Sequence, residues 1–343
     1  MSESAPDPAA PAPAPGDAPR REWVRVAARI AVALAGAVLL VVSLAAFAGS
    51  SAWWLDLPSH FRPQVAIALA AVALLQLSCR PRWLVSVWAA GAMTNGLMIA
   101  PHYVAQPAAG TGEALAIVHS NTGGDAVDTR RLAAWIAEAA PDLILLQEVT
   151  PRNLPRIIAE LDGAGLKYEL LASEPRNDTR GVGLLSRRGG VNAAIVRPAP
   201  DQDRPMVEAE LELAGMKLAL LGFHATRPAP KGPYGNQRAG MRGAATWSKA
   251  RAAAGFDRLL IGDFNSTSQG ALLGQLCREA ELFDARRGHG WQGTWPADLP
   301  AILRVPIDGA YHSDGIAVQR LRVGPSVGGD HLPILLVIQR RAA

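Results

Sequence analysis

The feature that most constrains this chain of 343 residues is an uncharged apolar run near its start, Ile30–Ala48. At 1.5 Å per residue, its 19 residues form a helix about 28 Å long, which matches the hydrocarbon thickness of a membrane. Four arginines in Arg20–Arg29 precede it. The run ends in Ala46-Phe47-Ala48, a sequence resembling a signal-peptidase site, but a signal core has only about 7–15 apolar residues. We therefore expect an uncleaved anchor.

Two shorter apolar runs follow, Val65–Cys79 and Trp83–Ala100, and each fits either a membrane helix or half of a buried hairpin. The first is short for a span, but Arg62 and Arg80 at its ends can lie along apolar surface and keep their charges in water. Tryptophan and tyrosine are enriched where helices leave a membrane. Because such residues stand at the ends of these runs, we predict three transmembrane helices. The aromatic residues concerned are Trp53, Trp54, Trp83 and Tyr103.

The charges of the flanking loops predict how these helices are oriented. Arginines in Arg20–Arg29 and in the turn Arg80–Arg82 favour the cytoplasmic side, because cytoplasmic loops carry an excess of positive charge. Three spans then place the rest of the chain outside the cytoplasm. We expect residues 1–23, rich in Ala and Pro, to be a disordered tail, residues 24–104 a membrane domain, and residues 105–343 a large soluble domain.

Composition excludes several classes of protein. Two cysteines, Cys79 and Cys277, are too few for a disulfide scaffold or for a cysteine-built zinc or iron–sulfur site. The net charge of +4 suggests a nucleic-acid partner at first sight. From residue 111 onward, however, 27 Lys and Arg face 25 Asp and Glu, so the soluble part is close to neutral. Charge alone therefore does not favour nucleic acid.

Beyond a linker predicted at Pro101–Gly112, apolar runs with the spacing of strands alternate with helical patterns. A tight turn at Ala214-Gly215 joins two strands into a hairpin. Hairpins together with crossover helices favour packed sheets covered by helices over a purely parallel sheet. The expected strands are Ala114–His119, Leu143–Leu146, Gly181–Ser186, Ala193–Val196, Met206–Glu212, Met216–His224, Arg258–Ile261, Ile307–Tyr311, Ile316–Leu321 and Leu332–Gln339, and the expected helices are Asp128–Ala139, Pro151–Leu161, Gln237–Ala254 and Ala271–Ala280.

Polar side chains stand where these apolar strands begin or end. Each one taken singly is more typical of a solvated loop than of a site. As a set they are rich in oxygen ligands, which suit a hard cation such as Mg²⁺ that binds a few carboxylates and keeps several waters. The residues are Asn121, Glu148, His224, Asp263, Asn265, Asp308, Asp330 and His331.

Four motifs in this order carry a family resemblance: Pro141–Val149, Gly181–Arg187, Gly262-Asp263-Phe264-Asn265 and Gly329-Asp330-His331. Over roughly residues 113–339 the chain resembles the endonuclease/exonuclease/phosphatase superfamily. The resemblance implies a two-sheet α/β sandwich flanked by helices that cleaves phosphoester bonds with Mg²⁺ or Mn²⁺. A three-span anchor before such a domain is similar to a membrane-attached bacterial branch of the superfamily, which implies the bacterial inner membrane and a periplasmic or extracellular catalytic domain.

The resemblance implies a metal site at the Glu148 strand. Glu148 is the expected principal ligand, and Asn121 would help to hold the metal or its water. Asp330 is expected near the metal.

The resemblance also implies the residues that act on the phosphate. Asp263 and Asn265 would contact the attacking or leaving oxygen and the phosphate. His331 would be the base or the group that polarises the phosphate, oriented by Asp308, and His224 would hydrogen-bond a phosphate oxygen. An imidazole paired with a carboxylate is held in one tautomer and made more basic, so the pairing is chemically coherent.

The chain departs from the family pattern at two positions. Gly309 follows Asp308 of the Ile-Asp motif, where the family often has an aromatic residue or His. Gly329 replaces the Ser of the terminal Ser-Asp-His box. Asn177 and Arg180 precede the Gly181 motif and can be phosphate contacts or members of a polar surface loop.

Three functions fit the sequence. The leading one is a membrane-anchored, metal-dependent phosphoester hydrolase, with phosphodiesters favoured and a nuclease included. The second keeps the chemistry but acts on a phospholipid or sphingolipid head group. The third is a catalytically silent binding module, which the intact Glu148, Asp263, Asn265 and His331 argue against. The bilayer and a phosphoester are the expected partners, and the oligomeric state is left open.

Overall fold

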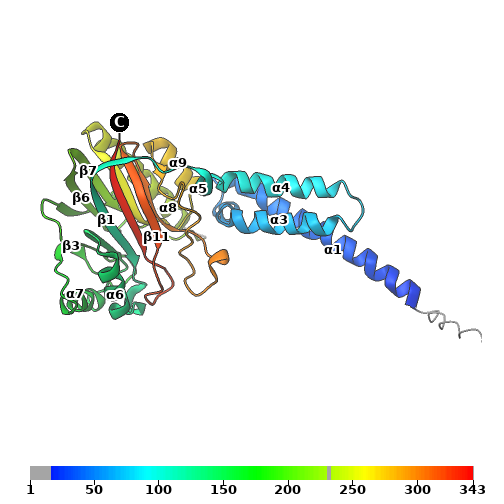
Figure 1. Cartoon of the computed structure of the whole chain (residues 1–343), viewed down its shortest axis with the longest axis horizontal. Coiled ribbons are helices and arrows are strands. Elements are labelled where there is room, and N and C mark those ends of the chain that lie inside the picture. Colours follow the sequence, from blue (N-terminus) through cyan, green and yellow to red (C-terminus); the bar gives the residue numbers. More distant parts are fainter. Residues whose placement is uncertain (1–16, 230–232, 343) are drawn as a thin grey trace, which may run out of the picture.

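The computed structural model describes residues 17–229 and 233–342 of the chain. Figure 1 shows a helical arm that extends from a sandwich of two sheets. The arm is built from residues before 105, and the sandwich from those after it.

Each sheet of the sandwich has six strands, mostly antiparallel, with one parallel pair in each. The first sheet runs in the order β11 (Ile316–Val323), β12 (Ile334–Arg341), β1 (Gly110–Asn121), β2 (Leu143–Gln147), β4 (Val182–Ser186) and β3 (Glu169–Glu174). The second runs β5 (Asn192–Val196), β6 (Met206–Leu213), β7 (Met216–Gly222), β8 (Asp257–Asp263), β10 (Asp308–His312) and β9 (Phe283–Asp284).

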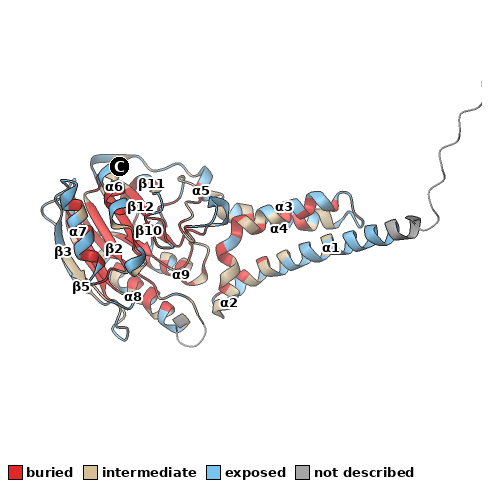
Figure 2. Cartoon of the chain, turned by 90° about the horizontal axis from the view of Figure 1, so that it is seen from below, coloured by how far each residue is buried: buried red, intermediate tan, exposed pale blue. Residues whose placement is uncertain are grey.

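Helices cover the outer face of each sheet and produce four layers. The alternation of apolar residues along the strands explains this arrangement, since successive side chains point to opposite faces. In β2, Leu143 and Leu145 join the core between the sheets, whereas Ile144 and Leu146 pack beneath the outer helices. Figure 2 shows the sheets as the buried centre of the sandwich. The first sheet is covered by α6 (Thr129–Ala139) and α7 (Asn153–Gly163), and the second by α8 (Pro233–Ala253) and α9 (Ala271–Ala280).

The predicted two-sheet sandwich flanked by helices is confirmed, and so is the hairpin at Ala214-Gly215, where Leu213 pairs with Met216. In both parallel pairs, β1 with β2 and β7 with β8, the carboxyl ends of the strands lie at the same edge of their sheet. The polar residues that follow these strands are therefore brought together.

After residue 100, two short strands and one α-helix were not expected from the sequence. Strands β3 and β9 carry too few apolar residues for a clear period. The predicted linker at Pro101–Gly112 is wrong over its first part, which forms helix α5 (Pro101–Val104), and β1 begins at Gly110. Helix α5 is fixed to the sandwich because Nε2 of His102 lies 3.1 Å from the carboxylate of Asp284. The guanidinium of Arg286 and His102 outweigh the effect of burial and hold the pKa of Asp284 well below its ordinary value.

The arm consists of one long helix and a hairpin of two shorter ones. Its elements are α1 (Asp17–Ala45), η1 (Ala46–Ala48), α2 (Trp53–Asp56), η2 (Leu57–Phe61), α3 (Arg62–Gln76) and α4 (Leu84–Ile99). Within residues 17–229 and 233–342, one helical stretch, the 27 residues Glu22–Ala48, is long and apolar enough to cross a membrane. Helices α3 and α4 have 15 and 16 residues and fall short of that length. The disordered tail predicted for residues 1–23 is wrong for residues 17–23, which belong to helix α1, and residues 1–16 lie outside the described part.

The arm and the sandwich differ in where they place large apolar side chains. Of the 25 that are exposed in the described part, 20 lie before residue 105. In Figure 2, most of α1 is coloured as exposed. Inside the arm, by contrast, a charged group is buried. The guanidinium of Arg62 donates hydrogen bonds there to the side chains of Ser43 and Asn95. A soluble helical hairpin exposes mostly polar residues, whereas this arm exposes large apolar ones in addition to the apolar cluster that it buries around Leu69 and Trp88.

Candidate active site

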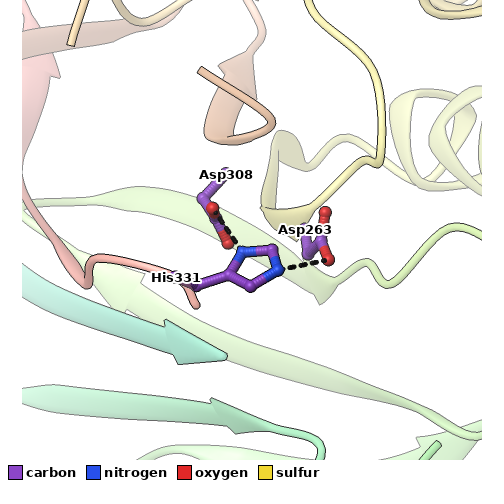
Figure 3. Close-up of side chains that lie close together, drawn as sticks. All are labelled: Asp263, Asp308 and His331. Carbon is purple, nitrogen blue, oxygen red and sulfur yellow. Dashed lines mark hydrogen bonds and ion pairs between the residues drawn. The ribbon is translucent and has the colours of Figure 1, made fainter. Parts of the chain in front are cut away.

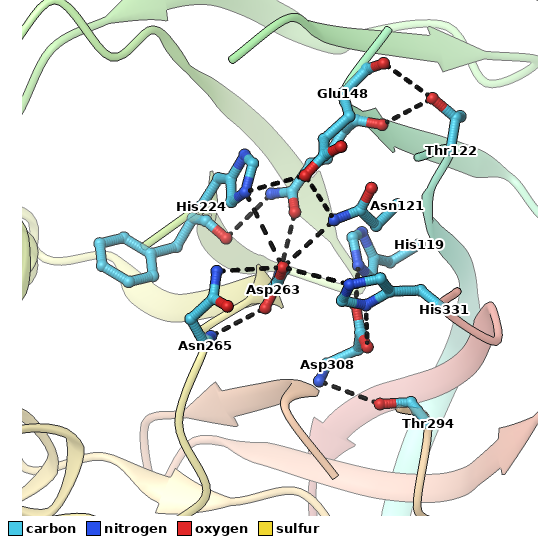
Figure 4. Close-up of polar contacts among 12 residues, drawn as sticks. His119, Asn121, Thr122, Glu148, His224, Asp263, Asn265, Thr294, Asp308 and His331 are labelled. Carbon is cyan, nitrogen blue, oxygen red and sulfur yellow. Dashed lines mark hydrogen bonds and ion pairs between the residues drawn. The ribbon is translucent and has the colours of Figure 1, made fainter. Parts of the chain in front are cut away.

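Asp308, at the start of β10, lies between two imidazoles at one end of the site. Its Oδ2 is 2.8 Å from Nδ1 of His331, and its Oδ1 is 3.1 Å from Nε2 of His119. Figures 3 and 4 show the pair and its surroundings. We refer to Asp308, His119 and His331 as the imidazole end. The sequence predicted the pairing of Asp308 with His331, but His119 was overlooked because it lies within the apolar strand β1.

The charges at the imidazole end stabilise one another. Burial disfavours a charge on His331, yet the carboxylates of Asp308 and Asp263 outweigh it and raise the pKa of His331 to about 10. Burial also opposes the charge on Asp308, but His331 and His119 hold the pKa of that carboxyl well below its ordinary value. His331 is therefore protonated at neutral pH, and its Nε2, 3.8 Å from Asp263, faces the rest of the site.

Glu148 and Asp263, which follow β2 and end β8, form the opposite end. The side-chain nitrogen of Asn121 lies between them, 3.2 Å from Glu148 and 3.2 Å from Asp263 (Figure 4). We refer to Glu148, Asp263 and Asn121 as the carboxylate end. Burial raises the pKa of Glu148 above its ordinary value, and burial together with Asp308 raises the pKa of Asp263 to about 7.

The carboxylate end fits a hard divalent cation. The half-buried carboxylate of Glu148 and the buried carboxylate of Asp263 are oxygen ligands of the kind that Mg²⁺ or Mn²⁺ binds. Desolvation raises the pKa of both, which a bound cation would reverse. A second group of potential ligands is Asp263, Asp308 and His331, whose ligand atoms lie within 4.8 Å of one another. Both oxygens of Asp308 already contact imidazoles, so its carboxylate is less available to a cation than those of Glu148 and Asp263.

His224 and Asn265 border the carboxylate end. Nε2 of His224 is 3.8 Å from both Glu148 and Asp263, and burial, together with the positive charge of Arg204, holds its pKa well below the ordinary value. His224 is therefore neutral. The side chain of Asn265 donates to Oδ2 of Asp263 at 3.2 Å, which orients that carboxylate.

The backbone is strained at two site residues. Glu148 has φ 56 and Asn265 has φ 45, in the left-handed region that residues with a side chain rarely adopt. The hydroxyl of Thr122 donates to the carbonyl oxygen of Glu148 at 2.9 Å and supports the first of these turns.

Gln147 and Arg204 also belong to the site, and the sequence reasoning missed both. Gln147 is buried between the sheets: its Oε1 accepts from the backbone of Asp263 at 2.9 Å, and its Nε2 donates to the carbonyl of Phe223 at 2.9 Å. Nη1 of Arg204 is buried and has no hydrogen-bond partner among the described residues. Burial lowers the pKa of Arg204, an effect that the charges of Asp263 and Glu148 oppose. Because Arg204 lines the cavity that contains these carboxylates, its Nη1 is available to an anion there. A Gln inside an apolar strand and an Arg in a loop gave no sequence signal.

A cavity of about 570 Å³ opens above the two ends. Asp330 lines it and accepts a hydrogen bond from the indole of Trp295 at 2.9 Å. Asn177 is exposed and does not line the cavity, and Arg180 is bound to the carboxylate of Asp178 and the carbonyl of Asp203. The structure thus brings together eight of the predicted residues and leaves Asn177 and Arg180 outside.

The two departures from the family pattern have local structural causes. A side chain at Gly309 would meet the guanidinium of Arg286, with a Cβ at 2.4 Å from Nη2. That guanidinium donates to the carbonyls of Asp308 and Pro306. Gly329 has φ 69, a conformation that a Ser would adopt only with strain.

The model of the Endonuclease/Exonuclease/phosphatase family matches residues 118–331, more than half of the chain. The chain belongs to this family. No curated protein matches it significantly.

Solved structures with the same fold share little sequence with the chain. A humanized D. rerio TDP2 is 17% identical, with 66% of this chain and 99% of that one covered and a TM-score of 0.52. An endonuclease/exonuclease/phosphatase from Bacteroides vulgatus is 16% identical, with 67% and 100% covered and a TM-score of 0.52. D. rerio TDP2 complexed with single-strand DNA product is 17% identical, with 66% and 99% covered and a TM-score of 0.50. At these identities the likeness shows the fold alone.

Proposed function

We propose that the chain is a membrane-anchored phosphodiester hydrolase that uses Mg²⁺ or Mn²⁺. The observation that carries the proposal is that the imidazole end and the carboxylate end lie side by side beneath one cavity. One end presents a protonated imidazole on a carboxylate, and the other presents two carboxylates, one buried and one half-buried, able to hold a cation. Hydrolysis of a phosphodiester needs positive charge near the non-bridging oxygens, a proton acceptor for water and a proton donor for the leaving oxygen.

A cation bound at the carboxylate end would supply positive charge to the phosphate. The remaining roles belong to this chain's own side chains. Asp263, which accepts hydrogen bonds from Asn121 and Asn265, is placed to accept the proton of the attacking water, and His331, whose pKa is raised to about 10, can donate a proton or a hydrogen bond from Nε2. Asp308 positions His331, and Asn265 positions Asp263. Arg204 and His224 face the space where phosphate oxygens would lie.

The membrane anchor is part of the same proposal. It is supported by the 27-residue apolar helix and by the outward-facing apolar side chains of the whole arm. We infer that α3 and α4 complete the anchor as a hairpin and that the sandwich lies outside the cytoplasm of a bacterial cell. The Arg80–Arg82 turn between α3 and α4 carries positive charge, which favours the cytoplasmic side for that turn. A reporter that is active only outside the cytoplasm should give signal when fused after Ala343 and none within Arg80–Arg82, and the reverse pattern would overturn the orientation.

Turnover of small soluble substrates tests the chemistry. The full chain in phosphatidylcholine nanodiscs is assayed with bis(4-nitrophenyl) phosphate and with 4-nitrophenyl phosphate. We expect Mg²⁺ or Mn²⁺ to support hydrolysis of the diester, EDTA to abolish it and added metal to restore it. Failure to hydrolyse either compound with either metal would reject the proposal, and hydrolysis of the monoester alone would reject its diester part.

A further inference from the structure

The wall of the cavity is completed by the arm. We call α2 and η2 together, Trp53–Phe61, the juxtamembrane segment. Leu57, His60 and Phe61 of this segment line the cavity that also contains Glu148 and His331. The arm therefore forms part of the active-site cavity, because side chains of the segment between α1 and α3 line it together with Glu148 and His331.

Buried polar contacts fix the juxtamembrane segment to the loop between Asp263, at the end of β8, and the start of α9. Oδ1 of Asp56 accepts a hydrogen bond from the backbone of Ala271 at 2.8 Å, at the start of α9. Nδ1 of His60 lies 3.1 Å from the hydroxyl of Thr267. Asp56, His60 and Thr267 are all buried. A buried polar group is costly to leave without a partner, so these contacts define one position of the segment against the site.

A second apolar element lies next to the juxtamembrane segment. Five large apolar side chains are exposed among the described residues after 105, and three of them belong to the turn around η4 (Ala301–Leu303): Leu299, Ile302 and Leu303. The side chain of Gln64, at the start of α3, donates to the carbonyl of Ile302 at 2.9 Å. In Figure 1 this turn is the orange coil on the side of the sandwich that faces the arm.

The cavity thus has a polar floor and an apolar rim. Among the described residues, Arg204 and Arg227 are the lysine or arginine side chains that line it. Single-stranded nucleic acid is held by a track of basic groups and stacking aromatic residues over several nucleotides. One anion site beside Leu57, Phe61 and an exposed apolar turn is suited to a molecule with one phosphate and a long apolar part.

We propose that the substrate is an amphiphilic phosphodiester that resides in the bilayer. Its phosphate enters the cavity while its apolar chain stays against Leu57, Phe61 and the η4 turn. The proposal rests on the phosphodiester hydrolase function inferred above. Water attacks phosphorus, the bond from phosphorus to the leaving oxygen breaks, and the proton lost by water balances the one gained by the leaving oxygen, so no other reactant is required.

Two probes that differ only in their apolar chain test this inference: hexadecyl 4-nitrophenyl phosphate and ethyl 4-nitrophenyl phosphate. Both are assayed on the full chain in the same phosphatidylcholine nanodiscs with Mg²⁺ or Mn²⁺. We expect kcat/KM for the hexadecyl ester to exceed that for the ethyl ester by at least about tenfold, the gain from burying part of an apolar chain. The ratio of the two should fall about tenfold in Phe61→Ser, since that side chain would no longer contact the chain.

Phe283→Ser is the matched control, because Phe283 is as exposed as Phe61, at 40%, but lies outside the cavity. It should leave the ratio of the two esters unchanged. Ile302→Ser, in the exposed turn, should lower the ratio even if Phe61→Ser does not fold.

The outcomes separate this inference from the function on which it rests. If neither ester nor bis(4-nitrophenyl) phosphate is hydrolysed, the hydrolase function itself fails. If the soluble diester is hydrolysed but the hexadecyl ester has no advantage, or if Phe61→Ser and Ile302→Ser keep the wild-type ratio, the amphiphilic substrate is rejected. Faster cleavage of a single-stranded oligodeoxynucleotide than of the hexadecyl ester would also reject it, in favour of nucleic acid.

Discussion

At the imidazole end of the cavity floor, the one carboxylate of Asp308 contacts two imidazoles, whereas at the carboxylate end Glu148 and Asp263 share the neutral amide of Asn121. Charge is balanced inside the protein at the first end. At the second, His331 and Arg204 compensate the carboxylates only in part, because the pKa values of Glu148 and Asp263 remain raised. The comparison teaches that a buried charge can stabilise the fold or bind a ligand. A charge that has partners within the chain does the first, and one that lacks them is available for the second. Substitutions at the two ends should therefore affect stability and activity differently.

The largest expected effect is on activity at the carboxylate end. Glu148→Gln keeps the volume of the side chain but removes the charge that would hold the cation. Activity on bis(4-nitrophenyl) phosphate with Mg²⁺ should fall at least about a thousandfold, or about 4 kcal/mol. Because burial disfavours the charged form of Glu148, the thermal midpoint without metal should stay the same or rise.

The matched control is Glu113→Gln. Glu113 is exposed and pairs with Arg188 away from the cavity, so this variant should keep wild-type turnover. Undiminished turnover in Glu148→Gln, with the same metal requirement, would contradict the assignment of the metal ligand.

The imidazole end should act as one unit. Asp308→Asn and His331→Gln should each lower kcat by about a hundredfold or more, because the imidazole loses either its positioning partner or itself. The double variant should be close to the worse single variant, since groups that act together are strongly non-additive. Kinetics on the three variants, with circular dichroism as a check of folding, measure this. Fully additive losses would show that Asp308 acts independently of His331.

Cation binding should stabilise the carboxylate end alone. At a Mg²⁺ concentration about 100 times its dissociation constant, the free energy of unfolding of the wild-type chain should rise by about 2.7 kcal/mol. The gain should be lost in Glu148→Gln and kept in His331→Gln. Denaturant unfolding with and without Mg²⁺ measures it, and equal gains in the two variants would remove the distinction between the ends.

The smallest effects are two slopes of stability against pH in EDTA. The pKa of Asp263 is raised in the folded chain to about 7, so the folded state binds more protons and stability should fall as pH rises from about 4 to about 7. The pKa of His331 is raised to about 10, so its contribution is complete below about pH 6.5 and is lost as pH rises toward 10. Each slope is at most about 1.4 kcal/mol per pH unit.

Variants assign each slope to its end of the site. Asp263→Asn should lessen the slope at lower pH, to which the raised pKa of Glu148 contributes with the same sign, and His331→Gln should remove the slope at higher pH. Denaturant unfolding from pH 4 to pH 10 measures both. An undiminished lower slope in Asp263→Asn would show that Asp263 does not contribute to it.

The sequence predicted the strands of the sandwich well where apolar residues alternate over a buried sheet, as in β2 and β8. It also predicted residues such as Glu148 and Asp263, because a polar group directly after a buried strand is conspicuous. It did not predict Arg204, whose loop reaches the site only through the packing of β6 beside β7. The contact of His60 with Thr267 was equally hidden, since it joins positions 207 residues apart. Local sequence patterns predict strands and the polar residues at their ends, whereas contacts between distant segments depend on how the whole chain packs.

The left-handed backbone at Glu148 and Asn265 has a consequence for how this chain can change. A glycine at either position would relieve the strain and would remove a side chain of the site. A library of variants selected for heat resistance alone should therefore accumulate glycine at these two positions and lose turnover. Selection for turnover should retain the strained residues and place its stabilising substitutions elsewhere in the fold.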